Sequence, residues 1–199
     1  MADVSYSTLE YYKDNADVFV TGSLSADMSE VRMKFANCLL PNARILDFGC
    51  GSGRDTKAFL ELGYSVDATD GSPELCRIAS KVTGITVRQM LFQDLNAISV
   101  YDGIWACASI LHLPKEELMS VLQKISTALK NDGILYTSFK YGVFEGLRHG
   151  RYFTDFTEET LTAFWSEVPS LKIIEMWLTE DVRPGREEER WINILAKRI

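Results

Sequence analysis

The sequence predicts an α/β protein with a mostly parallel β-sheet and an antiparallel last strand. From residue 43 onward, apolar segments of strand length alternate with helical segments, which is typical of parallel sheets. The last two apolar segments, 171–178 and 191–197, are separated by the charged turn 181–186, which suits an antiparallel hairpin. A glycine-rich turn directly after the first strand indicates a ligand site at the strand end.

The apolar segments give seven expected strands, each bounded by turn-forming residues. They are residues 43–48, 64–70, 85–88, 101–108, 134–139, 171–178 and 191–197.

The expected helices are recognised by their ends. The first covers about 55–62 and stops at Gly63. Ser72-Pro73-Glu74 begins the second, because it supplies a hydroxyl N-cap, a proline at the first helical position and an acid in the first turn. Pro114 opens the third helix, which the Asn-Asp-Gly run at 131–133 ends.

A glycine-rich connection at 140–156 leads to a last helix, which Thr157 caps and which has two acids in its first turn. The residues before the first strand are helical in character. We therefore expect a single domain, with an N-terminal helical cap over 1–42 and the α/β sheet over 43–199.

Composition limits the possible classes of protein. The 199 residues are 46% hydrophobic, which is enough for one domain with a full core. No apolar run reaches transmembrane length and the polar start is no signal peptide, so we expect a cytoplasmic protein without membrane contact, as a monomer or homodimer. The net charge of −7 argues against a broad nucleic-acid surface. Four cysteines without C-x-x-C spacing predict reduced thiols and no metal: Cys38, Cys50, Cys76 and Cys107.

The glycine-rich turn reads Asp47-x-Gly49-x-Gly51-x-Gly53. Glycine adopts positive φ readily and lets a ligand come close to the backbone. The dinucleotide pattern G-x-G-x-x-G would need a glycine at Arg54, and a P-loop would need Gly-Lys-Ser/Thr, which is absent. An NAD-dependent oxidoreductase is therefore disfavoured.

This pattern after a strand resembles motif I of the class I S-adenosylmethionine-dependent methyltransferases. The resemblance covers about residues 43–140. It implies a Rossmann-like seven-stranded methyltransferase sandwich, S-adenosyl-L-methionine as cofactor, S-adenosyl-L-homocysteine as product, and no metal. It also implies that Asp47 holds the methionine amine, and that the cofactor comes close to the backbone at Gly49 and Gly51.

Two further acids follow expected strands. Asp70 ends the second strand, 17 positions after Gly53, where a carboxylate can accept hydrogen bonds from both ribose hydroxyls. Alternatively, Asp70 only starts the turn before Ser72. Asp94 resembles the family position that accepts from the adenine amino group, or it is a solvated loop acid.

The aromatic N-terminal segment resembles segments that fold over the cofactor as a lid. Aromatic rings there would exclude water and contact the sulfonium. Alternatively, Tyr12 and Phe19 form the core stripe of a helix. The expected cofactor-binding residues are Tyr12, Asp47, Gly49, Cys50, Gly51, Gly53, Arg54, Asp70, Gly71, Ser72, Gln93, Asp94, Leu95 and Ser109.

Three segments, 105–114, 138–140 and 179–186, resemble small bacterial methyltransferases described as tellurite-resistance-like, of the methyltransferase type 11–12 group. Ser109 stands where relatives that methylate a nucleic-acid base or an amide carry an Asn/Asp-Pro-Pro-Tyr motif. Its absence weakens an N6-adenine or N5-glutamine interpretation.

The acceptor is expected at the loops that follow strands four to six. His112 is a candidate general base, or a packed residue at a helix start. Arginines in these loops suit a carboxylate or phosphate, although acids share the same rim and a solvated mixed-charge hairpin is the alternative. The expected substrate-binding residues are Lys140, Arg151, Tyr152, Arg183 and Arg186.

The sequence thus predicts methyl transfer from S-adenosylmethionine to a small-molecule acceptor. An RNA or protein methyltransferase and a non-catalytic cofactor-binding module are the alternatives. A basic groove with a separate recognition element would favour the first alternative, and the lack of a deep acceptor pocket would favour the second.

Overall fold

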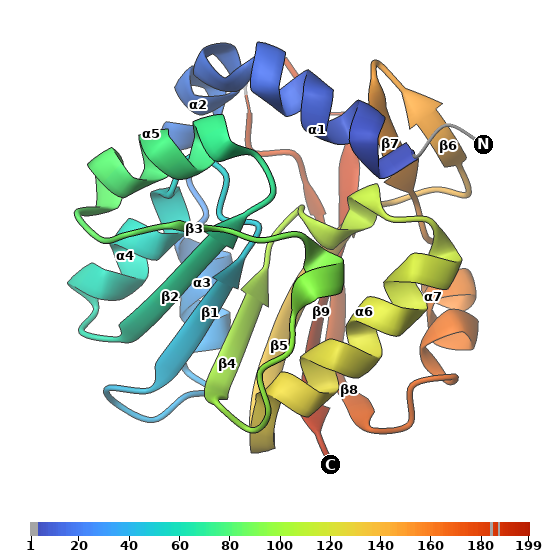
Figure 1. Cartoon of the computed structure of the whole chain (residues 1–199). Coiled ribbons are helices and arrows are strands. Elements are labelled where there is room, and N and C mark those ends of the chain that lie inside the picture. Colours follow the sequence, from blue (N-terminus) through green and yellow to red (C-terminus); the bar gives the residue numbers. More distant parts are fainter. Residues whose placement is uncertain (1–3, 184, 187) are drawn as a thin grey trace.

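A seven-stranded sheet forms the centre of the molecule (Figure 1). The computed structural model describes residues 4–183, 185–186 and 188–199 of the chain. Along the sheet the strands are β3 (Arg88–Gln89), β2 (Ser65–Asp70), β1 (Arg44–Phe48), β4 (Tyr101–Ala106), β5 (Leu129–Lys140), β9 (Arg190–Arg198) and β8 (Leu171–Glu180).

The pairing directions confirm the predicted fold class. Strands β1 to β5 pair in parallel, whereas β9 runs antiparallel to both β5 and β8. Strand order reverses at β1, where the chain crosses from β3 to β4, and this is where open α/β sheets bind ligands. The 181–186 turn links β8 to β9, with Pro184 outside the described residues.

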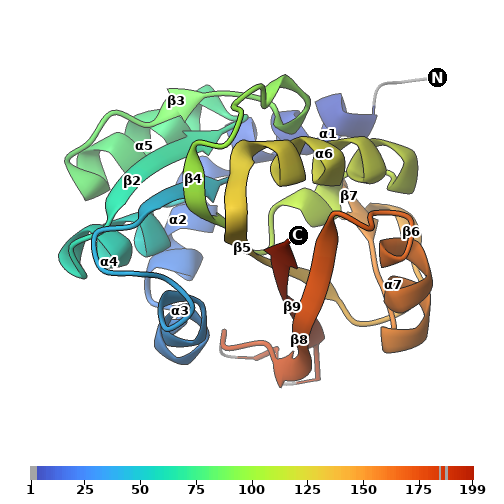
Figure 2. The same ribbon diagram turned by 90° about the horizontal axis from the view of Figure 1, so that it is seen from below.

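Helices cover both faces of the sheet (Figure 2). Buried side chains of α6 (Lys115–Ala128) and α7 (Glu158–Trp165) share one apolar core with the sheet. Those of α3 (Ser29–Ala36) and α4 (Arg54–Glu61) pack on the other face around Trp105. A smaller cluster holds α5 (Pro73–Thr83).

The predicted helix ends agree well with the structure. The hydroxyl of Ser72 accepts from the Leu75 amide as the N-cap of α5, with Pro73 in the first turn. Thr157 caps α7 and forms a capping box with Thr160.

Two strand predictions need correction. Strand β3 has only the exposed residues Arg88 and Gln89, because Val87 is buried against α5 rather than paired in the sheet. Strand β5 begins at Leu129, before the expected break. The 131–133 run instead shifts the pairing register between β4 and β5, with Asp132 at φ 64°.

The 140–156 connection was predicted as a loop, which is wrong. It contains a two-stranded hairpin, β6 (Glu145–Arg148) and β7 (Arg151–Thr154). Its two turn residues, His149 and Gly150, both have positive φ, as a tight hairpin requires.

The N-terminal residues are helical, as predicted. Helices α1 (Val4–Asp14) and α2 (Ala16–Leu24) cross over the carboxyl ends of the strands, and α1 packs against β7 and α5 (Figure 1). No helix in the described part of the chain combines the length and apolarity needed to cross a membrane.

Candidate active site

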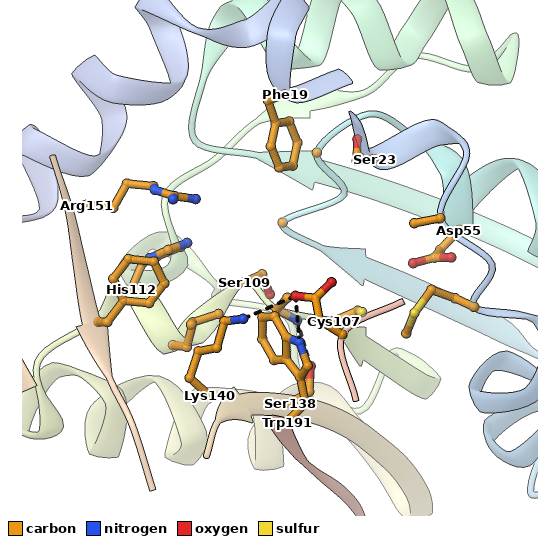
Figure 3. A pocket seen from close by; sticks show the side chains of 18 of the residues that line it. Phe19, Ser23, Asp55, Cys107, Ser109, His112, Ser138, Lys140, Arg151 and Trp191 are labelled. Atoms are coloured by element: carbon orange, nitrogen blue, oxygen red, sulfur yellow. Dashed lines mark hydrogen bonds and ion pairs between the residues drawn. The ribbon is translucent and has the colours of Figure 1, made fainter. Parts of the chain in front are cut away.

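A cavity of about 1020 Å³ lies between the carboxyl ends of the central strands and helices α1 and α2. Its walls include the turn after β1, the ends of β2, β4 and β5, and part of the β6–β7 hairpin. Figure 3 shows Phe19 at one wall, with Arg151 and His112 to one side and Asp55 and Cys107 to the other.

The glycine turn forms the part of the wall that a ligand can approach most closely. Gly49 and Gly51 have φ of 84° and 55°, which disfavours any side chain. A Cβ on Gly49 would lie 2.5 Å from the Cβ of Ser109, and one on Gly51 would lie 3.0 Å from the Phe19 ring. The Phe19 ring therefore packs closely against the bare backbone of Gly51.

Asp70 lies at the end of β2, beside this turn. Its Oδ2 accepts from the Gly51 amide and its Oδ1 from the Ser72 amide, both at 2.9 Å. Burial raises the pKa of Asp70, and these backbone donors oppose the rise. The carboxyl group is thereby fixed at the cavity wall with acceptor capacity left for a ligand.

Asp47 is buried below the turn and is 2% exposed. The Thr56 hydroxyl donates to its Oδ2 at 2.5 Å. Burial raises the pKa of Asp47 to about 7, with the neighbouring Asp55 adding to the rise. A cation brought next to Asp47 would reverse that shift and stabilise the carboxylate.

Asp55 anchors a charged network that the sequence did not predict. Arg32 and Arg54 each contact it at 2.7 Å, and the Trp105 indole donates to it at 3.1 Å. Burial works against the charge, but the two guanidinium groups together hold the pKa of Asp55 below its usual value. Arg54 lines the cavity, but its guanidinium is already paired with Asp55 and also donates to the carbonyl of Ser23.

His112 lies in the short helix η2 (Ile110–His112) under α1. Its Nδ1 is 2.6 Å from the Tyr152 carbonyl oxygen, which can only accept, so Nδ1 carries the proton. Nε2 therefore accepts from the Tyr12 hydroxyl at 3.0 Å. Burial lowers the pKa of His112 to about 4, and Arg151 and Arg148 add to this, so the ring is neutral at pH 7.

Most of the predicted site residues lie together on the cavity wall. They are Tyr12, Asp47, Gly49, Cys50, Gly51, Arg54, Asp70, Gly71, Gln93, Ser109, His112, Lys140, Arg151, Arg183 and Arg186. The roles given to them remain predictions.

Five predicted residues are not on that wall. Gly53 faces α5, where an added Cβ would come within 2.8 Å of Thr83. Ser72 caps α5, Leu95 is in the apolar core and Asp94 is exposed. Tyr152 directs its hydroxyl to Glu145 and meets the site through its backbone, whose carbonyl contacts His112 and whose amide donates to the Thr8 hydroxyl.

Several wall residues were missed because distant segments bring them in. Trp191 is adjacent to Lys140 through the β5–β9 register, with the Lys140 ammonium 4.0 Å from the ring centre. Cys107, at the end of β4, also lines the cavity. Its place near the end of the expected strand 101–108 was the one available signal.

The comparisons with known proteins agree with this geometry. A family model described as "Methyltransferase domain" matches residues 45–133, which hold the glycine turn and Asp70. Residues 45–133 thus have the sequence features of a methyltransferase domain, in agreement with the resemblance to the class I S-adenosylmethionine-dependent methyltransferases. The narrower tellurite-resistance-like grouping remains a prediction.

Among curated relatives, a ubiquinone biosynthesis O-methyltransferase of Xanthomonas campestris pv. campestris is 29% identical over 120 residues. That match covers 56% of this chain and 49% of the relative, so the alignment spans about half of the relative's length.

Solved structures share the fold. The 1,6-didemethyltoxoflavin-N1-methyltransferase of Burkholderia thailandensis superimposes with a TM-score of 0.75 at 23% identity, covering 96% of this chain and 84% of that one. Magnesium protoporphyrin IX methyltransferase of Synechocystis also gives 0.75, at 16% identity, covering 99% and 100%.

Proposed function

We propose that this protein transfers a methyl group from S-adenosylmethionine to a small-molecule acceptor. The observation that carries the proposal is the joint placement of the glycine turn and Asp70 under the Phe19 ring. Bare backbone, a fixed carboxylate and a facing aromatic ring together fit a ligand with a ribose and a planar base.

The chain offers a residue for each part of such a cofactor. Asp70 would accept from the ribose hydroxyls, and the backbone of Gly49 and Gly51 allows close approach. Asp47 would hold the methionine amine, and Gln93 lies on the wall where the base is expected. The bound cofactor supplies a methyl group on a sulfonium with a neutral leaving group. The described residues show no cluster of His, Cys, Asp or Glu suited to a metal ion.

His112 is the proposed contact for the attacking atom of the acceptor. A pKa of about 4 makes it a weak base, so full proton abstraction at pH 7 is not its strongest role. Its Nε2 can accept a hydrogen bond from an O–H or N–H and so orient the attacking lone pair. The Tyr12 hydroxyl occupies that acceptor position here.

A small-molecule acceptor fits the cavity of about 1020 Å³ under α1 and α2 better than a polymer does. The relatives include enzymes named for ubiquinone biosynthesis and for didemethyltoxoflavin, which supports this class. An RNA or protein acceptor, or cofactor binding without catalysis, remains the alternative. A cytoplasmic location and a monomeric or homodimeric state are likewise predictions.

Calorimetry with S-adenosylhomocysteine tests the cofactor assignment. Asp70→Ala should weaken binding by about 1–3 kcal/mol, because the ribose hydroxyls lose their charged acceptor. Glu61→Ala, which changes an exposed acid away from the cavity wall, is the matched control and should bind normally. Equal affinities in the two folded variants would contradict the assignment. Turnover of labelled S-adenosylmethionine against a metabolite panel then tests methyl transfer.

A further inference from the structure

Most of the cationic side chains around the cavity are already neutralised by acids. Arg148 forms a two-pronged pair with Asp155, with distances of 3.1 and 3.0 Å. Arg183 does the same with Asp181 at 2.8 and 2.5 Å, and Lys140 also contacts Asp181 at 3.2 Å. An anionic ligand would have to compete with these internal carboxylates for the same donors.

Arg151 differs from these residues. Among the residues that the structure describes it forms no ion pair, and its Nε is buried without a hydrogen-bond partner. Its guanidinium lies 4.5 Å from the Tyr11 ring centre and 5.1 Å from that of Phe153. Figure 3 shows the group extending into the cavity between Phe19 and His112.

Aromatic contacts stabilise the Arg151 cation only in part. Each such contact contributes on the order of 0.5–1 kcal/mol at an exposed site and more when water is excluded, whereas a partly buried charge such as Arg151 loses part of its hydration and gains no counterion in return. His112 is neutral and supplies no compensating charge. Glu145 on the hairpin and Asp155 directly after it are already paired, with Lys115 and Arg148 respectively. The arrangement therefore favours a negative group from outside the chain.

The surfaces beside Arg151 are flat and aromatic. Tyr12 packs edge-on against Phe19 at 5.0 Å and against His112 at 5.7 Å between ring centres. His112 packs in the same manner against Phe153 at 4.8 Å. A planar ring bearing the negative group matches both the charge and the shape of this part of the cavity.

We infer that Arg151 binds the anionic group, a carboxylate or a phosphate, of a planar aromatic methyl acceptor. This inference rests on the proposed function, since it names the class of acceptor that the same site takes. The forked donors of the guanidinium would grip two oxygens of the anion, and the ring would lie along Tyr12 and Phe153 with its nucleophile toward His112.

The test measures binding of benzoate, phenyl phosphate and neutral benzamide by calorimetry, with and without S-adenosylhomocysteine. The wild-type chain should bind one of the two anions at least about tenfold more tightly than benzamide. The tighter anion identifies the group as a carboxylate or a phosphate. Arg151→Gln should abolish the preference and keep its affinity for S-adenosylhomocysteine.

Arg88→Gln is the matched control, because Arg88 is an exposed arginine in β3, away from the cavity wall, and forms no ion pair among the described residues. It should keep the anion preference. If Arg151→Gln does not fold, Arg151→Lys replaces it. Lysine keeps the charge but not the fork, so anion binding should weaken roughly fivefold or more.

Three results would overturn the inference. One is no anion preference in the wild-type chain, and another is a preference that persists in Arg151→Gln. The third is an Arg151→Gln variant that loses S-adenosylhomocysteine binding instead, which would place Arg151 at the cofactor. A wild-type chain that binds the anions but no S-adenosylhomocysteine would refute the proposed function and leave the anion site standing.

Discussion

His112 should make the stability of this protein depend on pH in a way that one substitution can isolate. The ring is 7% exposed and makes hydrogen bonds through both nitrogens in its neutral form. Protonation would turn Nε2 into a donor facing the Tyr12 hydroxyl and would place a charge in a buried site near Arg151. His112→Asn removes the titrating group and keeps an amide that can donate to the Tyr152 carbonyl.

The size of the effect follows from the shift of the His112 pKa from 6.5 to about 4. Since the unfolded chain accepts a proton near pH 6.5 and the folded chain does not, stability is lost as pH falls from about 6.5 to 4. At pH 5.5 the loss is about 1.4 kcal/mol, and near pH 4 it approaches about 3 kcal/mol. Above pH 7 the titration of His112 no longer changes the free energy of unfolding.

Asp47 contributes with the opposite sign. Its pKa is raised to about 7, so the stability that its proton provides is complete at low pH and is lost as pH rises through 7. The two opposing contributions partly cancel in the wild-type chain. The informative quantity is therefore the difference in unfolding free energy between wild type and His112→Asn at each pH.

Urea unfolding followed by tryptophan fluorescence measures that difference from pH 8 to 5.5, which stays above the isoelectric point of about 4.9. The variant should be less stable at pH 8, and the deficit should shrink by about 1.4 kcal/mol at pH 5.5. His149→Asn is the control, since it replaces the only other histidine, exposed in the hairpin turn. A deficit that stays constant or grows toward low pH would refute the reasoning.

Two further predictions concern the cofactor side. Gly51→Val should abolish S-adenosylhomocysteine binding with the fold kept, since the new side chain would lie between the Gly51 backbone and the Phe19 ring. Gly63→Val is the control for backbone strain, because Gly63 also has a positive φ, of 87°, but has open space around it. If α1 and α2 form a mobile lid, amide exchange over 6–21 should slow when S-adenosylhomocysteine is added, and deleting residues 1–22 should leave a folded sheet with weaker cofactor binding. Full protection without ligand, or a truncation that cannot fold, would show that the segment is part of the core.

The central fold was predictable because its signals are local. Strands β1 and β4 are rich in apolar residues, and strand β2 lies between Gly63 and the Ser72 cap of α5. Strand β3 was misplaced because its two paired residues are exposed and carry no apolar pattern. The β6–β7 hairpin was missed because glycines on both sides of His149 looked like a loop, whereas Gly150 serves the tight turn.

The placement of Gly49, Gly51 and Asp70 on one wall was also predictable, since they lie at the ends of adjacent parallel strands in one continuous segment. The acceptor side was not. The contact between Tyr12 and His112 joins residues 100 positions apart, and the His112 contact with Tyr152 depends on the hairpin. Sequence alone also could not show which arginine forms no ion pair, because tertiary packing decides which acid each arginine meets.

The charges of the cavity now explain why an anionic acceptor is compatible with a chain of net charge −7. Asp55 is held by two arginines and Asp181 by Arg183 and Lys140, so both act locally as nearly neutral groups. On one side of the cavity, Arg151 forms no ion pair with an acid of the described chain. On the other side, the Asp70 carboxyl group can still accept hydrogen bonds from a ligand. An acceptor held by its negative end at Arg151 would keep that charge away from the carboxyl groups near the glycine turn and would leave its neutral end free to react. Net charge therefore says little about this site, and the pairing of each individual charge decides what it can bind.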